Sequence, residues 1–168
     1  MGMGVAIEKL TWGSWTPHKY KIAVSGCPRN CSEATIKDFG IIGVDSGWEI
    51  HVAGNGGIKV RVTDFLCKVK TDEELFEMVK AYMQFYREDA YYLERTAHWM
   101  ERVGLEYVKE VLFDKEKRKM YADSFDISQK SAQVDPWAKA IEDGFTKEFS
   151  PIVIDPNDSH SFEAKEQI

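Results

Sequence analysis

The feature that most constrains the fold is a change in hydrophobic period close to residue 70. Upstream of it, apolar and polar residues alternate in short runs, which is the pattern of β-strands. These runs cover residues 20–25, 41–45, 48–53 and 58–62. Ser46-Gly47 and Gly54-Asn55-Gly56-Gly57 separate the later runs and predict tight turns, because glycine reaches positive φ at no steric cost.

Downstream of residue 70 the apolar residues recur every three to four positions, as on a helix. Thr71-Asp72-Glu73-Glu74 predicts the helix start, since a threonine N-cap and a glutamate three residues later form a capping box. The pattern continues to Met100 with an expected break near Glu88-Asp89, and Gly104 predicts its end. A further helix is expected from Leu105 to Phe113, and the aromatic side chains between Tyr82 and Trp99 are expected to pack these helices.

Together these elements predict an α+β fold, a mixed β-sheet with flanking helices, over residues 1–113. Residues 5–10 resemble the last turns of another helix, and residues 32–37 are expected to form a short one after the second cysteine. Residues 114–168 contain few apolar runs and several prolines. We expect an extended or partly helical C-terminal arm there, with one or two helical turns near 137–143 and a loose end beyond residue 157.

Composition restricts the class of partner. The chain has 168 residues, a formal net charge of −6 and no long apolar run. An acidic chain has no general attraction for nucleic acid or anionic membranes, and a membrane span needs about 18 consecutive apolar residues. We therefore expect neither as a partner. The three cysteines are an odd and small number, which argues against a secreted disulfide framework and favours a cytoplasmic location.

Cys27 and Cys31 are candidate metal ligands, separated by Pro28-Arg29-Asn30. If a helix begins at Pro28, the two thiolates lie one turn apart at a helix end whose N–H groups favour negative charge. The spacing alone does not decide, because it also fits two unrelated thiols. A zinc site needs further ligands from Cys67 or the four histidines, which form no ligand-spaced pair, and a redox dithiol normally has two intervening residues.

The segment Val24–Ala34 resembles the second cysteine motif of the nitrite and sulfite reductase haem-protein family. The resemblance covers about residues 4–113 and includes further segments in the same order. These are Thr35–Gly40, Val44–Glu49, Gly54–Gly57, Leu66–Val69 and Tyr92–Thr96, with weaker agreement at Asp135–Trp137. Within the family, the chain is most similar to the C-terminal part of the large subunit of NAD(P)H-dependent assimilatory nitrite reductases.

In this family a C-x5-C pair and a C-x3-C pair hold a 4Fe-4S cluster, and the last cysteine bridges to the iron of sirohaem. The resemblance implies that Cys27 and Cys31 are cluster ligands and that Cys31 is the bridging thiolate. It implies reduction of nitrite to ammonium, with electrons from NAD(P)H through FAD in other domains. Sirohaem or cluster contacts are implied for Arg29, Asn30, Asn55, Gly56 and Arg61, and no catalytic residue is assigned. Ala53 stands where the related sulfite reductases often have glycine.

The C-x5-C pair of the family is absent, and it would lie just upstream of a segment like Met3–Glu8. We therefore expect an N-terminally truncated chain, colourless and inactive in isolation, whose partners are the missing N-terminal domains of the same polypeptide and the substrate nitrite. A small subunit or a homodimer is a further candidate. Cys67 is expected to be a buried core residue. The alternatives are a sulfite reductase fragment with the same cofactors, a non-catalytic module for subunit contacts, and a zinc-binding structural domain.

Overall fold

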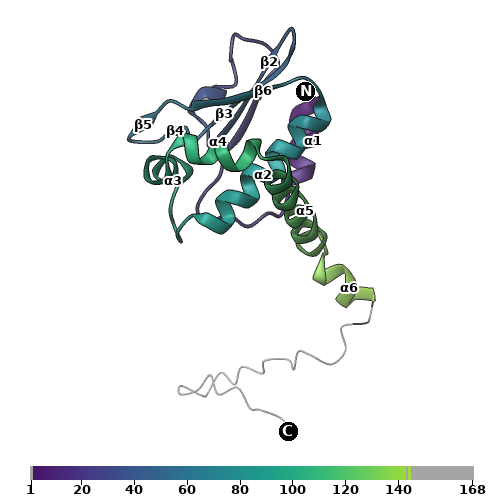
Figure 1. Cartoon of the computed structure of the whole chain (residues 1–168). Coiled ribbons are helices and arrows are strands. Elements are labelled where there is room, and N and C mark those ends of the chain that lie inside the picture. Colours follow the sequence, from purple (N-terminus) through teal and green to yellow (C-terminus); the bar gives the residue numbers. More distant parts are fainter. Residues whose placement is uncertain (1, 143, 145–168) are drawn as a thin grey trace, which may run out of the picture. The chain divides into compact units, whose positions relative to one another are not determined.

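The computed structural model describes residues 2–142 and 144, in two compact units, Met1–Val134 and Asp135–Ile168 (Figure 1). The described part of the second unit contains one helix, α6 (Pro136–Glu142). The elements of the first unit are, in chain order, α1 (Gly2–Thr11), β1 (Ile22–Ser25), the 3-10 helix η1 (Ala34–Ile36), β2 (Phe39–Val44), β3 (Gly47–Val52), β4 (Asn55–Gly56), β5 (Val60–Arg61), β6 (Asp64–Val69), α2 (Asp72–Asp89), α3 (Thr96–Val103), α4 (Leu105–Phe113) and α5 (Lys115–Ala132).

Four strands form one mixed sheet in the order β1-β2-β3-β6. β1 and β2 are parallel, with Ile22 opposite Phe39, and the other neighbours are antiparallel. The β2–β3 hairpin turns at Gly47, whose φ is 128° and where a Cβ would lie 2.1 Å from the Val69 carbonyl oxygen, so only glycine fits. β4 and β5 form a separate two-stranded ribbon. The expected α+β fold with a mixed sheet is confirmed.

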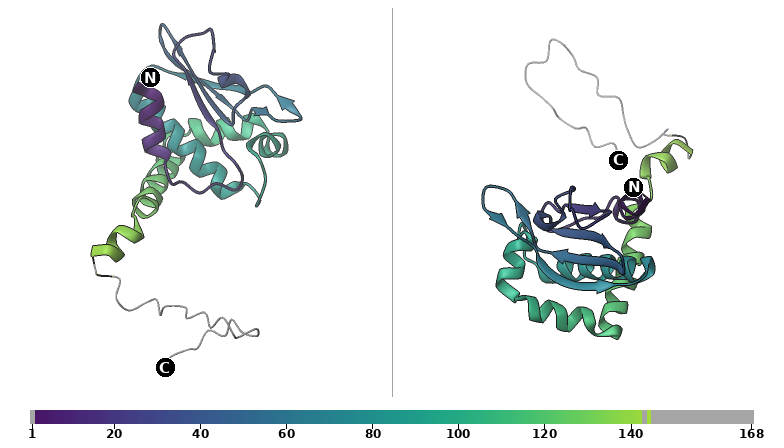
Figure 2. Two further views of the ribbon diagram at one scale, coloured as in Figure 1. Left: turned by 180° about the vertical axis from the view of Figure 1, so that it is seen from behind. Right: turned by 90° about the horizontal axis from the view of Figure 1, so that it is seen from above.

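α2, α3 and α4 gather on one face of this sheet, as the two views of Figure 2 show. α2 begins with the expected capping box, in which Thr71 Oγ1 accepts from the Glu74 N–H. The expected break is also confirmed, because α2 ends at Asp89 and α3 begins only at Thr96. Gly104, with a φ of 85°, separates α3 from α4. These boundaries follow from local signals that the sequence carries.

An aromatic cluster fills the space between the sheet and the helices. The Trp99 ring is fully buried and contacts the rings of Tyr82, Phe85 and Tyr86. Phe39 of β2 extends the cluster to the sheet through its contact with Tyr82. These side chains are core, as predicted. Tyr91 and Tyr92, which the same prediction included, are instead exposed, because they lie in the connection between α2 and α3. No described helix is long and apolar enough to cross a membrane.

α5 differs from the expected arm, because the first unit continues through it to Val134 and not only to Phe113. Asp114 starts the helix as its N-cap, accepting from the N–H groups of Glu116 and Lys117. The helix packs along α2, where Arg118 pairs with Glu77 at 2.6 Å and Phe125 is fully buried. The sequence does not predict that α5 packs on α2, because α5 is rich in charged residues and buries few apolar ones.

The C-terminal half of α5 also holds the end of α1. The buried Gln129 amide donates to the carbonyl oxygens of Leu10 at 2.8 Å and Trp12 at 3.1 Å, and it accepts from Ser14 Oγ. The last carbonyl groups of a helix have no N–H partner within the helix, and the Gln129 amide donates to such groups at the end of α1. The N-terminal helix is therefore fixed by residues more than a hundred positions downstream.

Two strand predictions need correction. Of the expected strand 58–62, only Val60–Arg61 pairs as a β-strand. The fourth strand of the sheet is instead β6, which the alternation of apolar residues did not predict. The apolar residues of the expected strand, Ile58, Val60 and Val62, are exposed. Their alternation resembles that of a half-buried strand, but this ribbon has no partner layer in the described part of the chain.

Candidate functional site

The cysteine pair lies in the connection between β1 and η1, in two successive turns. The Asn30 N–H donates to the Cys27 carbonyl oxygen at 3.1 Å, and the Glu33 N–H donates to the Asn30 carbonyl oxygen at 2.9 Å. Asn30 and Glu33 both have φ values near 55°, in the left-handed region. The expected helix through the pair is wrong: the connection is helical only at Ala34–Ile36. A left-handed residue every third position interrupts the right-handed helix.

The Asn30 side chain is what holds this loop. Its amide oxygen accepts from the Ala34 N–H at 2.7 Å and from Ser25 Oγ at 3.2 Å, while its amide nitrogen donates to Thr35 Oγ1 at 2.8 Å. Asparagine tolerates the left-handed conformation better than most residues, and its amide replaces the backbone bonds of the missing helix. Asn30 therefore joins the end of β1 to the start of η1 across the cysteine pair.

Both cysteines of the pair are exposed, whereas Cys67 is partly buried in β6. Burial raises the pKa of the Cys67 thiol to about 11, so this thiol stays protonated at neutral pH. Within the described residues, no group of three or more histidine, cysteine, aspartate or glutamate side chains could hold a metal ion. The loop thus presents two thiols, with no third ligand from the described residues beside them.

A hollow of about 340 Å³ lies beside Cys27. The turn Gly26-Cys27-Pro28 forms one side, and the β2–β3 hairpin with Gly43, Asp45 and Trp48 forms the other. A Cβ on Gly43 would lie 2.8 Å from the Gly26 carbonyl oxygen, so glycine allows the cysteine loop to approach β2. Trp48 is fixed by a 2.8 Å hydrogen bond from its indole N–H to Asp72 of α2. The thiol side of the loop is therefore concave and open.

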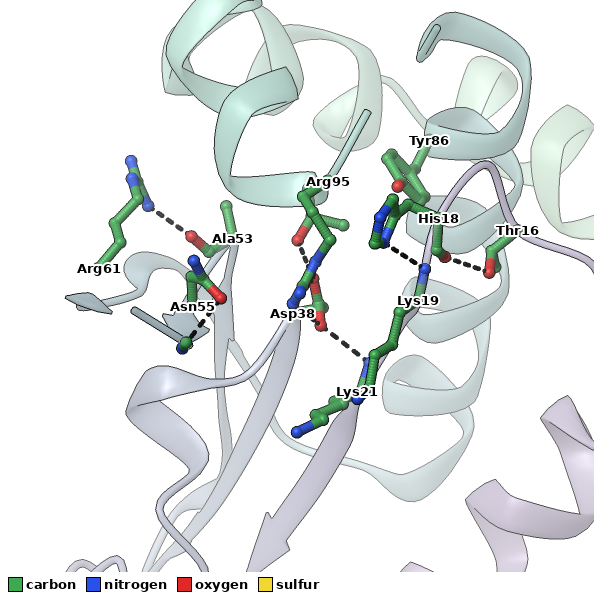
Figure 3. A network of polar contacts seen from close by, with 12 residues as sticks. Thr16, His18, Lys19, Lys21, Asp38, Ala53, Asn55, Arg61, Tyr86 and Arg95 are labelled. Carbon is green, nitrogen blue, oxygen red and sulfur yellow. Dashed lines mark hydrogen bonds and ion pairs between the residues drawn. The ribbon is translucent and has the colours of Figure 1, made fainter. Parts of the chain in front are cut away.

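A buried carboxylate anchors the residues behind the loop (Figure 3). Asp38, between η1 and β2, is fully buried and pairs with the Arg95 guanidinium at 2.9 Å. It also accepts from the Lys21 N–H and from the Thr96 hydroxyl. A buried carboxylate is tolerated when its lone pairs are satisfied in this way. We call Asp38, Arg95 and Thr96 the Asp38 clamp; it ties the strand side of the cysteine connection to the start of α3.

The Asp38 clamp was not predicted from sequence. Arg95 and Thr96 lie 57 and 58 residues after Asp38 in the chain. A single aspartate before a strand gives no indication that it is buried. The only indication was the resemblance, which includes both Thr35–Gly40 and Tyr92–Thr96. Next to the clamp, the Ala53 N–H donates to the Asp38 carbonyl oxygen, and Ala53 itself is buried with a φ of 61°. This left-handed conformation is one that glycine adopts at lower cost.

The other residues expected to contact the cofactors are distant from the two cysteines in sequence. Hydrogen bonds and packing within the chain hold them in place. The Asn55 amide closes its own turn, bonding to the Lys59 carbonyl oxygen and the Gly57 N–H, and Gly56 lies against Ile36 of η1. Arg61 donates to the Ala53 carbonyl oxygen at 2.7 Å and pairs with Asp64 at 2.7 Å. Figure 3 shows Asn55 and Arg61 beside Ala53. Arg29 is exposed between the two cysteines.

Chemically, the loop can supply two thiolate ligands. Thiolates are soft donors that select iron–sulfur clusters, zinc or Cu(I). Zinc in a structural site takes four ligands from the protein, and the described residues bring no others to the pair. The donor set therefore fits half of a thiolate-ligated cluster, and it gives no support to a zinc site built by the described residues. His160, one of the four histidines, lies outside the described residues.

The sequence of this chain is similar to that of known proteins of one family. The sequence profile of the nitrite and sulphite reductase 4Fe-4S domain matches residues 3–120. Nitrite reductase [NAD(P)H] of Bacillus subtilis (strain 168) is 52% identical over 85% of this chain, and the nitrite reductase (NADH) large subunit of Escherichia coli (strain K12) is 45% identical over 68%. An assimilatory-type sulfite reductase of Nitratidesulfovibrio vulgaris is 33% identical over 67%.

The matched regions make up only part of these relatives. The chain spans 18% of the Bacillus protein, 14% of the Escherichia protein and 51% of the sulfite reductase. The profile, by contrast, covers well over half of the present chain and includes the cysteine loop, the sheet and the helices up to the start of α5. The chain therefore belongs to the nitrite and sulphite reductase 4Fe-4S domain family.

Proposed function

We propose that this chain is the C-terminal cofactor-binding part of an NAD(P)H-dependent nitrite reductase, a cytoplasmic oxidoreductase that reduces nitrite to ammonium. Cys27 and Cys31 are two of the four ligands of its 4Fe-4S cluster, and Cys31 also bridges to the iron of sirohaem. The observation that carries the proposal is the pair of exposed thiols on a loop fixed by Asn30, in a chain 52% identical to a nitrite reductase.

The residues of the loop suit these cofactors. An iron–sulfur cluster is held by thiolates and is tuned by the hydrogen bonds and solvent around it, and both thiols face outward where a cluster can reach them. When bound, the cluster and sirohaem supply one-electron steps and a site for the nitrite nitrogen. The chain's proposed part is to present the two ligands on one loop, and the two turns and the hydrogen bonds of Asn30 support this role.

The remaining ligands and the electron supply come from elsewhere. The other two thiolates, the FAD and the NAD(P)H site belong to further domains of the same polypeptide, in keeping with the small share of each relative that the chain spans. Arg29, exposed between the ligands, is proposed to contact the sirohaem carboxylates. Asn55, Gly56 and Arg61 are proposed as further sirohaem contacts, although the side chains of Asn55 and Arg61 are already hydrogen-bonded within the chain.

Cysteine substitutions in the full-length polypeptide test the proposal. Cys27→Ser and Cys31→Ser are expected to abolish nitrite turnover and to lower the iron content, while the sirohaem absorption changes most in Cys31→Ser. Cys67→Ser is the matched control and is expected to keep both the iron and the spectrum, because Cys67 lies in the sheet with a protonated thiol. Unchanged iron content in both loop variants contradicts the proposal.

A sulfite reductase with the same cofactors is the second candidate. One relative of this kind is 33% identical to the chain, against 52% for the Bacillus nitrite reductase, and this difference favours nitrite. Steady-state turnover of nitrite and of sulfite by the same full-length preparation decides between the two: the proposal expects the larger kcat/KM for nitrite.

A further inference from the structure

The backbone on both sides of Cys31 is hydrogen-bonded. The peptide group before it contains the Asn30 carbonyl oxygen, which accepts from the Glu33 N–H at 2.9 Å. The peptide group after it contains the Ser32 N–H, which donates to Ser25 Oγ at 3.2 Å. A peptide group is planar, so holding the groups on both sides of a Cα leaves little freedom for the direction of its Cβ. The loop therefore fixes the direction in which the Cys31 side chain leaves the backbone.

Cys27 is held in a different way. Its carbonyl oxygen accepts from the Asn30 N–H at 3.1 Å, but the residue after it is Pro28, which has no N–H to donate. The residue before it is Gly26, and glycine restricts the backbone less than any other residue. The two cysteines of one loop thus differ in how firmly the backbone around them is fixed, and the more firmly fixed one is Cys31, to which we assign contact with both cofactors.

Ser25 connects this arrangement to the sheet. It is the last residue of β1, is only 3% exposed and lies opposite Ile42 of β2. Its hydroxyl accepts from the Ser32 N–H and donates to the Asn30 amide oxygen, each at 3.2 Å. Asn30 and Ser32 are the two neighbours of Cys31 in the chain. A single oxygen atom at the end of β1 therefore holds the residues on both sides of Cys31.

The two contacts of Ser25 require a hydroxyl group. The Ser32 N–H needs an acceptor and the Asn30 amide oxygen needs a donor, and serine and threonine carry both functions on one atom. Ser25→Ala removes both hydrogen bonds. Ser25→Thr keeps the hydroxyl, and a β-branched side chain suits a position in a strand. The pair of substitutions therefore separates the hydroxyl from the space that the side chain fills.

We propose that Ser25 is a positioning residue for Cys31, and that its hydroxyl sets the orientation of the thiolate that joins the cluster to sirohaem. This role rests on the proposed function, whereas the hydrogen bonds of Ser25 do not. Groups that orient a metal ligand without touching the metal are worth roughly 10- to 100-fold in affinity or activity. Because Cys27 keeps its own contacts without Ser25, we expect the hydroxyl to affect the link to sirohaem more than the retention of iron.

Substitutions in the full-length polypeptide test this role. Ser25→Ala is expected to keep the iron, to shift the sirohaem absorption bands and to lower kcat for nitrite on the order of 10-fold with little change in KM. Ser25→Thr is expected to restore the bands and kcat. Ser32→Ala removes an exposed hydroxyl beside Cys31 but keeps the N–H, so it is the matched control and should behave like the unsubstituted protein. Unchanged absorption bands in Ser25→Ala overturn the inference.

A loss of stability alone should not reproduce this result. Ala81→Gly weakens α2 at a buried position away from the cysteine loop, and it should leave the sirohaem bands and kcat unchanged. An equal shift of the bands in Ala81→Gly and Ser25→Ala overturns the inference. Failure of Ser25→Thr to restore the bands also overturns it, because the hydroxyl is then not the group that matters.

Amide hydrogen exchange in the 168-residue chain tests the hydrogen bond without any cofactor. The Ser32 N–H is expected to be protected in the unsubstituted chain and to exchange on the order of 10-fold faster in Ser25→Ala. The Ala53 N–H, which donates to the Asp38 carbonyl oxygen, is the internal control and should not change. A Ser32 N–H that is unprotected in the unsubstituted chain, or that exchanges equally in both, overturns the inference.

The test is separable from that of the proposed function. Absence of iron from the unsubstituted full-length protein refutes the cluster, whatever the exchange of the Ser32 N–H. Iron in that protein together with unchanged sirohaem bands in Ser25→Ala refutes the role of Ser25 but keeps the cluster.

Discussion

The helical face and the cysteine side of the first unit are built in opposite ways. On the helical face, large aromatic side chains are fully buried against one another, and α5 packs along α2. On the cysteine side, two thiols are exposed, a hollow lies beside them, and the β1 edge has no partner in the described residues. The helical face is closely packed, whereas the cysteine side exposes two thiols and one edge of the sheet.

The difference separates the residues that stabilise the fold from those that we propose to bind the cofactors. Folding depends on burial and on satisfied polar groups, so the aromatic cluster and the Asp38 clamp provide its stability. The cysteine loop contributes little apolar burial and is held by the hydrogen bonds of Asn30. Substitutions on the two sides should therefore differ in size and in kind.

The largest effect is expected at the centre of the helical face. Trp99→Ala removes a fully buried ring and its hydrogen bond to Asp89, and should lower the free energy of unfolding by about 3–5 kcal/mol. Urea denaturation of the 168-residue chain measures this loss. Trp15→Ala is the matched control, because Trp15 is 82% exposed and should change stability by less than about 0.5 kcal/mol. Similar losses in both variants would show that the aromatic cluster is not the core.

Removing the carboxylate of the Asp38 clamp should be the next largest change. Asp38→Ala leaves the Arg95 guanidinium, itself only 18% exposed, without its partner, at a cost of about 3 kcal/mol. The same denaturation experiment applies. Glu106→Ala removes a carboxylate that is 88% exposed from the Lys109 pair, and no measurable loss is expected from it. A negligible loss for Asp38→Ala would mean that the clamp does not stabilise the fold.

The three thiols should react at different rates. Cys67 has a pKa of about 11 against an ordinary 9.0, which reduces its thiolate on the order of 100-fold at pH 8. Iodoacetamide followed by mass spectrometry should therefore label Cys27 and Cys31 first, and labelling of Cys67 should accelerate as the pH rises toward 11. Early labelling of Cys67 at pH 8 would place it outside the sheet.

Loss of the Asn30 amide should weaken the cysteine loop rather than the core. Asn30→Ala removes three side-chain hydrogen bonds and leaves alanine in a left-handed conformation, so a loss of about 1–2 kcal/mol is expected. Faster exchange of the Ala34 amide should accompany it. Ser32→Ala, which removes an exposed hydroxyl from the same loop, is the control. Equal losses of stability in the two variants would show that the Asn30 side chain does not hold the loop.

The smallest effect concerns a single backbone angle. Ala53→Gly relieves the left-handed strain of Ala53 but loses a buried methyl group, so the two terms should offset within about 0.5 kcal/mol. Ala81→Gly, at a buried position inside α2, has no strain to relieve and should cost about 1 kcal/mol or more. If both substitutions cost the same, the positive φ of Ala53 is not a source of strain.

The elements that could be predicted are those with local signals. The β2–β3 hairpin follows from Ser46-Gly47, and the start of α2 follows from the Thr71 capping box, because each depends on a few adjacent residues. α5 was missed because its charged surface hides the buried face that docks on α2. The strand predicted for residues 58–62 is too long. Alternation of apolar residues does not tell whether another layer of the protein covers them, and here they are exposed.

The cysteine pair could be singled out from the sequence, but its geometry could not; its role as a ligand pair stays a prediction. Spacing and resemblance identified Cys27 and Cys31, yet a helix was expected where the Asn30 side chain makes two turns. The Asp38 clamp depends on a contact between residues far apart in the chain, and no local pattern announces it. The assignment of sirohaem contacts to Arg29, Asn55, Gly56 and Arg61 stays a prediction.

The hold of Gln129 on α1 affects how this protein can be shortened. The family profile ends at residue 120, in the first half of α5, so a chain cut there would keep the whole region that the profile matches. It would also lose the side chain that bonds to the carbonyl oxygens of Leu10 and Trp12. The end of the family profile is thus not the end of the folding unit, and residues beyond it stabilise the helix at the opposite end of the chain.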